Sequence, residues 1–289
     1  MLITVFTPTY NRAHLLPRLY ESLKSQTFQD FEWLIVDDGS TDNTEVLITS
    51  LQEKRGEEEF SIRYIKQMNG GKHRAINHGV QKAHGELFFI VDSDDSLPMD
   101  SIERIMFYWQ QIKDDKSFGG IAGYMAHHDG TIIGRGNEND VLDCSSLELR
   151  YKYHVKGDMA EVFRTEVLRE IPFPEYSEEK FCPEALVWNR IAQKYKLRVF
   201  KNVIYYRDYL DGGLTSKIVQ IRMKSPMATI TTYQELNSYD IPLTQKIKAS
   251  INYWRFYACL PKGKRAPRLP WFWLCTAPIG WLMHLRDKK

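Results

Sequence analysis

The segment Leu87–Leu97, with the sequence LFFIVDSDDSL, joins a short apolar run to a cluster of acidic residues. Its first five residues are apolar, and three aspartates follow within four positions, at Asp92, Asp94 and Asp95. An uninterrupted apolar run is typical of a strand that is buried on both faces of a parallel sheet. We therefore expect a central strand whose end carries negative charge that needs a positive partner.

Strand and helix patterns alternate through residues 1–97. The predicted strands are 2–7, 31–38, 61–67 and 86–92, and the predicted helices between them are 11–26, 42–54 and 70–85. This alternation predicts a doubly wound α/β half with a parallel sheet. In such sheets, ligands bind beyond the carboxyl ends of the strands.

The pattern changes after residue 100. A helix is predicted at 101–112, and 119–134 reads as two strands around a His-Asp-Gly turn. Residues 216–260 have a helical pattern. They lead into the basic run PKGKRAPRLP (261–270) and the aromatic segment WFWLCTAPIGWLM (271–283).

The composition favours a globular protein and argues against several other classes. Hydrophobic residues make up 43% of the 289 residues and charged residues 26%. The net charge of +2, without a basic helix or zinc-finger spacing, gives no support for a nucleic-acid partner. The four cysteines are far apart and the amino-terminal residues resemble a strand rather than a signal peptide, so we expect free thiols in a reducing cytosol. No apolar run reaches the length of about 18 residues that a membrane-spanning helix needs.

Polar and acidic residues follow three of the predicted strands. Because the carboxyl ends of parallel strands meet at one edge, these side chains should converge. They are Thr7, Tyr10, Asp37, Asp38, Asp92, Asp94 and Asp95. An all-oxygen set suits Mg²⁺ or Mn²⁺, which bridge one or two carboxylates to substrate phosphates. The alternative is that Asp95 or Ser96 only caps a turn or helix.

Positive charge for a phosphate is expected in GGKHRAINHG (70–79). Lys72 and Arg74 lie near a helix that two glycines open, where free backbone N–H groups favour anions. The segment is neither a Walker A loop nor a Gly-x-Gly-x-x-Gly fingerprint. The alternative for both side chains is simple solvation.

Three stretches together resemble the family 2 glycosyltransferases, a large inverting group that uses nucleotide-diphosphate sugars. They are VFTPTYNRAHLLPRLYESLKSQTFQDFEWLIVDDGSTDNT (5–44), GGKHRAINHG (70–79) and FFIVDSDDSL (88–97). The resemblance is close over the first hundred residues and weakens beyond them. It implies a single Rossmann-like domain of the glycosyltransferase A-type, with a mainly parallel central sheet flanked by helices.

The resemblance also implies a division of the chain. The catalytic domain is predicted at 1–215, with a nucleotide-sugar-binding half at 1–97 and an acceptor-binding half at 98–215. A helical extension at 216–289 follows. The segment YLDGGLT (209–215) resembles a loop that closes over the donor in this family.

The resemblance implies roles for individual residues near the donor. Thr7, Tyr10 and Asp38 would hold the nucleobase and ribose, with Asp38 reading a uracil-type imide. The predicted donor-binding set is Thr7, Pro8, Tyr10, Arg12, Asp38, Lys72, Arg74, Asp92 and Ser93. The predicted metal ligands for Mn²⁺ or Mg²⁺ are Asp94, Asp92 and Asp95, as the pair Asp92 with Asp94 or the rival pair Asp94 with Asp95.

Inversion at the anomeric carbon needs a general base on the acceptor hydroxyl. In the family, this base is commonly the Asp of a Glu-Asp pair at a helix start, and here Glu184 precedes Ala185. Glu184 is therefore the candidate base, Glu179 a weaker one and Asp158 a third. The alternative is that Glu184 only favours the positive end of a helix.

The aromatic tail beside a basic run fits an interfacial anchor on an anionic inner leaflet, and the alternative is a helix packed on the catalytic domain. We expect a cytoplasmic protein, peripheral on the inner face of the cell membrane.

The donor would be UDP-linked, the transferred unit a hexose or N-acetylhexosamine, and the acceptor a glycan or lipid-linked oligosaccharide for bacterial surface polysaccharide. The processive Gln-x-x-Arg-Trp motif is absent, which favours single addition. Rival interpretations are a nucleotidyltransferase and a non-catalytic sugar-nucleotide or glycan-binding module.

Overall fold

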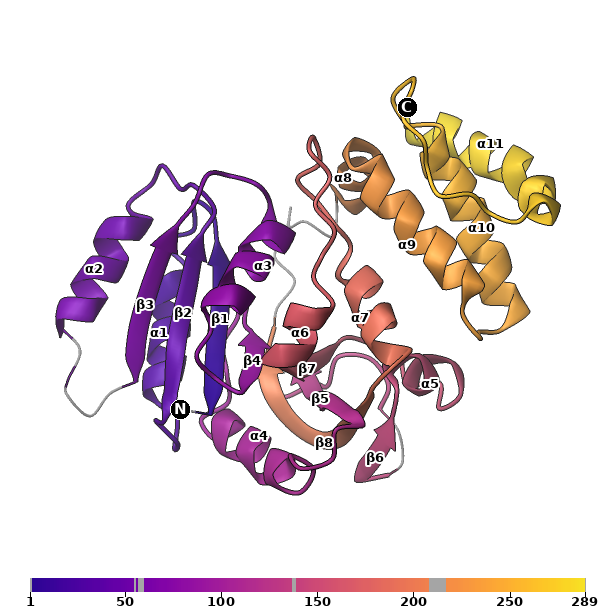
Figure 1. Cartoon of the computed structure of the whole chain (residues 1–289). Coiled ribbons are helices and arrows are strands. Elements are labelled where there is room, and N and C mark those ends of the chain that lie inside the picture. Colours follow the sequence, from indigo (N-terminus) through magenta and orange to yellow (C-terminus); the bar gives the residue numbers. More distant parts are fainter. Residues whose placement is uncertain (1, 55, 57–59, 137–138, 208–216, 289) are drawn as a thin grey trace. The chain divides into compact units, whose positions relative to one another are not determined.

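The computed structural model describes residues 2–54, 56, 60–136, 139–207 and 217–288. The chain divides into two compact units (Figure 1). The first unit is Met1–Pro172 with Ile191–Asp208, and the second is Phe173–Arg190 with Tyr209–Lys289. Residues 173–190 thus group with the carboxyl-terminal helices. The predicted closing loop at 209–215 lies outside the described residues.

An eight-stranded sheet with the order β3-β2-β1-β4-β7-β5-β8-β6 forms the centre of the first unit. Its strands are β1 (Ile3–Thr9), β2 (Phe31–Asp37), β3 (Ser61–Lys66), β4 (Leu87–Ile90), β5 (Phe118–Ala126), β6 (Val141–Cys144), β7 (Met159–Arg164) and β8 (Lys196–Tyr206). The first four strands pair in parallel, as do β5 and β8, whereas β7 and β6 run antiparallel to their neighbours. The prediction of a mainly parallel sheet, with its first four strands, is confirmed.

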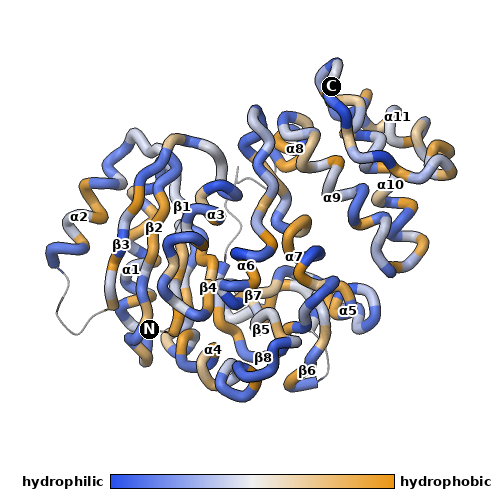
Figure 2. The backbone as a smooth tube through the Cα atoms, viewed as in Figure 1, coloured by the Kyte–Doolittle hydropathy of each residue, from blue (hydrophilic) through white to orange (hydrophobic). Residues whose placement is uncertain are grey.

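Helices cover both faces of this sheet. The helices of the first unit are α1 (Leu16–Lys24), α2 (Thr44–Lys54), α3 (Lys72–Lys82), α4 (Ser101–Gln110), α5 (Ser146–Tyr151) and α6 (Thr165–Glu170). Apolar side chains of α1, α2 and α4 form one core with alternate residues of the strands, including the fully buried Trp33 and Trp109. The residues of β1, β2 and β4 are almost all buried, as expected for strands covered on both faces, and Figure 2 shows hydrophobic stretches in β2 and β4.

Helix α3 packs against the other face at very short range. A Cβ atom on Gly79 would lie 2.1 Å from the ring of Phe6, which itself stacks on Phe88 with ring centroids 4.8 Å apart. Only glycine permits this approach. The packing holds α3 against β1 (Figure 1), so that its amino-terminal end, with Gly71 and Lys72, lies near the carboxyl ends of the strands.

The predicted strand pair at 119–134 is wrong in its second half. The first strand is β5, but after the turn Ile132 forms only an isolated bridge with Ala126. Both edges of β5 are already occupied, by β7 and β8. A returning segment therefore has no free edge on which to extend a ladder.

The second unit is helical in its described part. It contains α7 (Glu184–Ala192), which begins there, then α8 (Ile218–Lys224), α9 (Pro226–Ser238), α10 (Leu243–Tyr257), the 3₁₀ helix η2 (Trp271–Thr276) and α11 (Ala277–Asp287). Its small core is Ile230, Tyr253 and Phe256. Among the described residues, no helix is both long and apolar enough to cross a membrane.

Glu32 in β2 is a fully buried carboxylate that ties neighbouring segments together. It accepts hydrogen bonds from the Thr4 hydroxyl, from Arg63 Nη1 at 2.7 Å and from the His84 backbone amide at 2.7 Å. Burial by itself raises the pKa of Glu32, but these hydrogen bonds outweigh burial and hold the pKa below its usual value. The ionised form therefore stabilises the sheet.

We predict that Glu32→Gln lowers the free energy of unfolding at pH 7 by about 1–3 kcal/mol, because an amide cannot accept from all three donors. The contribution of the carboxylate is present above the unfolded-state pKa of about 4.3 and is lost as the pH falls through the lower folded-state pKa. The difference from wild type, measured by denaturant unfolding, should therefore shrink below about pH 4. Glu53→Gln, on the exposed side of α2, is the matched control. A difference that does not change with pH would contradict this role.

Candidate active site at the carboxyl ends of the strands

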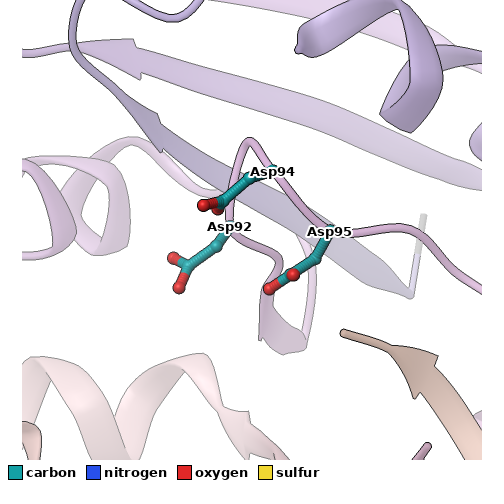
Figure 3. A group of neighbouring side chains, drawn as sticks. All are labelled: Asp92, Asp94 and Asp95. Carbon is teal, nitrogen blue, oxygen red and sulfur yellow. The ribbon is translucent and has the colours of Figure 1, made fainter. Parts of the chain in front are cut away.

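The three aspartates that follow β4 lie together. Within the described part of the chain, Asp92, Asp94 and Asp95 each offer a carboxylate oxygen, and these oxygens lie within 4.8 Å of one another (Figure 3). Asp92 and Asp94 are partly exposed, whereas Asp95 is buried. These acids directly follow β4, which pairs with β1 at a fixed register in the sheet. We call Asp92, Asp94 and Asp95 the acidic cluster.

Strand β8 anchors the acidic cluster through Tyr205. The backbone N–H of Asp92 donates to the Tyr205 hydroxyl at 3.0 Å, and that hydroxyl donates to Oδ2 of Asp95 at 2.6 Å. Burial, together with the charge of Asp92, raises the pKa of Asp95 to about 7. Asp95 caps no helix, since α4 begins only at Ser101, but its backbone N–H closes a turn by donating to the Asp92 carbonyl at 3.1 Å.

Basic side chains compensate the other two acids. Nζ of Lys72 lies 2.6 Å from Oδ1 and 2.9 Å from Oδ2 of Asp92, and Nη1 of Arg12 lies 2.6 Å from Oδ2 of Asp94. Arg18 donates to the backbone carbonyl of Asp94. Burial alone would raise the pKa of Asp92, but Lys72 above all, and then Arg207 and Arg12, hold this pKa below its usual value.

Arg207, at the end of β8, is a further cation beside the cluster. Its Nη1 donates to Oδ2 of Asp158 at 3.2 Å, and Asp158 immediately precedes β7. Burial would lower the pKa of Arg207, but the charges of Asp92 and Asp95 raise it. The cluster therefore faces cations from three separate segments of the first unit.

Sequence reasoning missed both Tyr205 and Arg207. The available signal is their spacing of two residues, because Arg207 directly follows β8 and residues two apart on a strand point to the same face. The local sequence around Tyr205 could not predict that its side chain contacts the end of β4, because this contact joins segments more than a hundred residues apart.

Asp38 lies at the end of β2 in a buried turn. Its Oδ1 accepts from Gln67 Nε2 and from the Gly70 amide, each at 2.8 Å, and its Oδ2 accepts from the Gly71 amide at 2.7 Å. A carboxylate has about four acceptor positions, so about one remains for a ligand. Gly71 has φ 97°, a conformation that favours glycine, and it is also the amino-terminal cap of α3.

The other predicted donor-binding residues have different exposures. The Thr7 hydroxyl is buried and accepts a hydrogen bond from Trp33 Nε1 at 2.9 Å, so it satisfies a polar group in the core. Tyr10 is 48% exposed, and Ser93 is buried. Pro8 and Arg74 are partly buried, and the Arg74 side chain lies against Gly70.

The predicted base candidates fall in both units. Glu184 is the first residue of α7 in the second unit and is partly buried, and Ala185 beside it is exposed. Glu179 has a structural role, because its two oxygens accept from the amides of Met227 at 2.6 Å and Ala228 at 2.9 Å at the start of α9. Asp158 belongs to the first unit and is half-exposed.

Comparison with known proteins shows the family. Residues 4–169, more than half of the chain, match the family model described as glycosyl transferase family 2. The chain therefore belongs to this family and is a glycosyltransferase. The resemblance seen in its first hundred residues is confirmed.

Two curated relatives show how far the similarity extends. A GalNAc(5)-diNAcBac-PP-undecaprenol beta-1,3-glucosyltransferase of Campylobacter jejuni is 24% identical over 290 residues, which cover 90% of this chain and 87% of that protein. An uncharacterized glycosyltransferase of Nostoc sp. is 36% identical over 146 residues. That match covers 50% of this chain but only 41% of the Nostoc protein.

Solved structures support the fold. Staphylococcus aureus TarS 1–349 in complex with UDP has a TM-score of 0.63 at 19% identity, covering 91% of this chain and 73% of that one. The mannosyltransferase PcManGT of Pyrobaculum calidifontis, in complex with GDP-Man and Mn²⁺, has a TM-score of 0.59 at 16% identity, covering 99% and 88%. These similarities confirm the predicted glycosyltransferase A-type fold.

We predict that Tyr205→Phe lowers the free energy of unfolding by about 1–3 kcal/mol, because the partly buried amide of Asp92 and the buried carboxylate of Asp95 lose their partner. Tyr10→Phe is the matched control, because its hydroxyl is exposed and has no hydrogen bond within the described residues. Chemical denaturation of both variants measures the difference. Equal stability of the two variants would show that Tyr205 does not anchor the acidic cluster.

Proposed function

We propose that the protein is a metal-assisted, inverting glycosyltransferase that moves one sugar from a UDP-linked donor to a glycan or lipid-linked oligosaccharide. The observation that carries this proposal is the acidic cluster at the carboxyl ends of the strands, surrounded by Lys72, Arg12 and Arg207. TarS has been crystallised with UDP and with UDP-GlcNAc, and PcManGT with GDP-Man and Mn²⁺, which supports a nucleotide-sugar donor here.

The acidic cluster suits Mn²⁺ or Mg²⁺ by its chemistry. It offers only carboxylate oxygens, within 4.8 Å of one another, and hard divalent cations prefer such ligands. We assign Asp94 and Asp92 as the ligands, because they are partly exposed, whereas Asp95 is buried against Tyr205. The bound ion would supply positive charge that stabilises the departing diphosphate.

The cations of the cluster then have a second role. Lys72 and Arg12 neutralise Asp92 and Asp94, and both side chains are about one-third exposed and so within reach of a ligand. We propose that they turn from the carboxylates to the diphosphate oxygens of the donor, for which Arg and Lys are suited. The amino-terminal end of α3 adds backbone N–H groups to this anion site.

The nucleobase side of the site is formed around Asp38. We propose that the acceptor position left on Asp38 takes the imide N–H of uracil and that the exposed ring of Tyr10 contacts the base. Thr7 then acts through the packing of β1 rather than through its hydroxyl.

For inversion we propose Glu184 as the general base that takes the proton from the acceptor hydroxyl. Asp158 is the alternative, and its ion pair with Arg207, a cation whose charge also interacts with Asp92 and Asp95, supports this choice. We propose that residues 1–215 act as the catalytic part and residues 216–289 as an extension, and that the transferred unit is a hexose or N-acetylhexosamine.

The C. jejuni relative is named for an undecaprenol-linked substrate, which supports a lipid-linked acceptor and peripheral association with the inner face of the membrane.

We predict that Asp94→Asn reduces Mn²⁺-dependent release of UDP from UDP-sugars at least about 100-fold, because the charge that holds the ion is lost. The thermal stabilisation by UDP with Mn²⁺ should disappear as well, since ligand binding to the native state raises the melting temperature. Asp114→Asn, at an exposed carboxylate after α4, is the matched control. Unchanged activity of Asp94→Asn would refute the metal assignment. Release of pyrophosphate from a nucleoside triphosphate would favour a nucleotidyltransferase instead.

We predict that Glu184→Gln lowers the turnover number about 100- to 10,000-fold, the usual contribution of a general base. Affinity for UDP should stay within about twofold, because no donor contact is removed. Glu178→Gln, at an exposed glutamate nearby, is the control. If Glu184→Gln keeps full turnover and Asp158→Asn loses it, the base is Asp158.

A further inference from the structure

The carboxyl-terminal part of the chain has an unusual charge. The whole chain carries a net charge of +2, yet residues 241–289 contain ten Lys and Arg residues and a single acidic residue, Asp287. Asp287 is neutralised inside the unit by two contacts with Arg255, at 2.5 and 2.7 Å. The exposed charge of this region is therefore exclusively basic. Its exposed members after α10 are Lys262, Lys264, Arg265, Arg268, Arg286 and Lys288.

One face of η2 and α11 packs against α10. Trp254 Nε1 donates to the Trp273 carbonyl at 3.0 Å, and His284 Nδ1 lies 3.5 Å from Cys259 Sγ. A Cβ atom on Gly280 would lie 2.5 Å from the carbonyl oxygen of Ile251, so glycine is what allows the close approach. Buried positions thus recur every three or four residues, which fixes the orientation of α11.

The opposite face of η2 and α11 is apolar and exposed. Trp271 is 81% exposed and Leu282 is 62% exposed. The full set is Trp271, Phe272, Leu274, Ile279, Trp281, Leu282 and Leu285, which we call the apolar face. Single exposed hydrophobic side chains are ordinary, but seven within residues 271–285 indicate a contact surface.

We propose that the apolar face docks into the surface of an anionic lipid bilayer, with α11 lying in the plane of the interface. The inference extends the proposed function, because a lipid-linked acceptor is held at such a surface. Tryptophan prefers the headgroup region, where its ring is buried and its N–H meets polar groups. The six exposed Lys and Arg residues complement anionic headgroups.

The charge pattern favours a lipid surface over a second copy of the chain. In a two-fold dimer the same patch meets itself. Here this would bring basic residues close to their own symmetry mates, and juxtaposed like charges oppose association. An anionic bilayer meets the same residues with charge of the opposite sign.

The test is sedimentation of the full chain with vesicles of phosphatidylglycerol and phosphatidylethanolamine, compared with phosphatidylcholine vesicles. Wild type should bind the anionic vesicles preferentially. Trp281→Ser with Leu282→Ser should weaken this binding at least about tenfold, because the inserted apolar area is lost. The matched control is Val46→Ser with Phe107→Ser, at two exposed hydrophobic residues of the first unit.

The charge is tested separately. Lys264→Glu with Arg265→Glu should reduce binding to anionic vesicles and weaken its dependence on salt. The control is Lys54→Glu with Lys113→Glu, which makes the same charge change in the first unit. Circular dichroism spectra and melting temperatures equal to wild type establish that all four variants fold.

Three outcomes would overturn the docking surface. These are equal binding to both kinds of vesicle, binding that survives the Trp281 and Leu282 changes, and a dimer in sedimentation velocity that those changes dissociate without any vesicle binding. Stabilisation by UDP with Mn²⁺ is measured on the same variants and should be unchanged. Vesicle binding without UDP binding in wild type would refute the proposed function alone, whereas UDP binding without vesicle binding would refute the docking surface alone.

Discussion

Three aspartates within four residues place more negative charge at the end of β4 than a largely buried position tolerates without compensation. The first unit meets this constraint with cations from separate segments. Lys72 comes from the start of α3, Arg12 from the turn after β1, and Arg207 from the end of β8. The arrangement of the sheet and its helices therefore determines whether the acidic cluster can exist at all.

The same compensation explains how the site can work with a charged ligand. The carboxylates already pair with partly exposed cationic side chains. They lose little when a metal ion binds the carboxylates and a diphosphate binds the cations, because each charge still has a partner of opposite sign. Asp95 differs from its neighbours, because its partner is the neutral hydroxyl of Tyr205. Asp95 therefore has a structural role in the site, whereas Asp92 and Asp94 can exchange their cationic partners for a metal ion.

Much of the first unit could be predicted because its signals are local. The strands β1 to β4 are short apolar runs, and Asp38, Asp92 and Asp94 follow them directly. The roles of Tyr205 and Arg207 could not be predicted, because they depend on β8 reaching the sheet from a distant part of the chain. The predicted strand near Ile132 is wrong for the same reason: the edges of β5 are occupied by β7 and β8, and that pairing cannot be read from the local sequence.

The second unit shows the limits of local patterns in another way. The acidic residues of 173–190 look alike in sequence, yet Glu179 caps α9 with both oxygens, whereas Glu184 opens α7. Hydrophobic residues of 271–285 likewise separate into a buried and an exposed face only because Gly280 lets α11 approach α10 closely. Packing, rather than residue type, assigns the role.

The central claim is that the acidic cluster and a nucleotide diphosphate together hold one divalent cation. Electron paramagnetic resonance of free Mn²⁺, titrated with the full chain in the presence and absence of UDP, tests this claim directly. UDP alone also binds Mn²⁺ through its diphosphate, so the reference is the same titration of Mn²⁺ and UDP without protein. The account predicts that, beyond this reference, one further equivalent of Mn²⁺ leaves the free pool for each chain when UDP is present. If adding the protein lowers the free Mn²⁺ signal no further than UDP alone does, at every protein concentration, the account is contradicted.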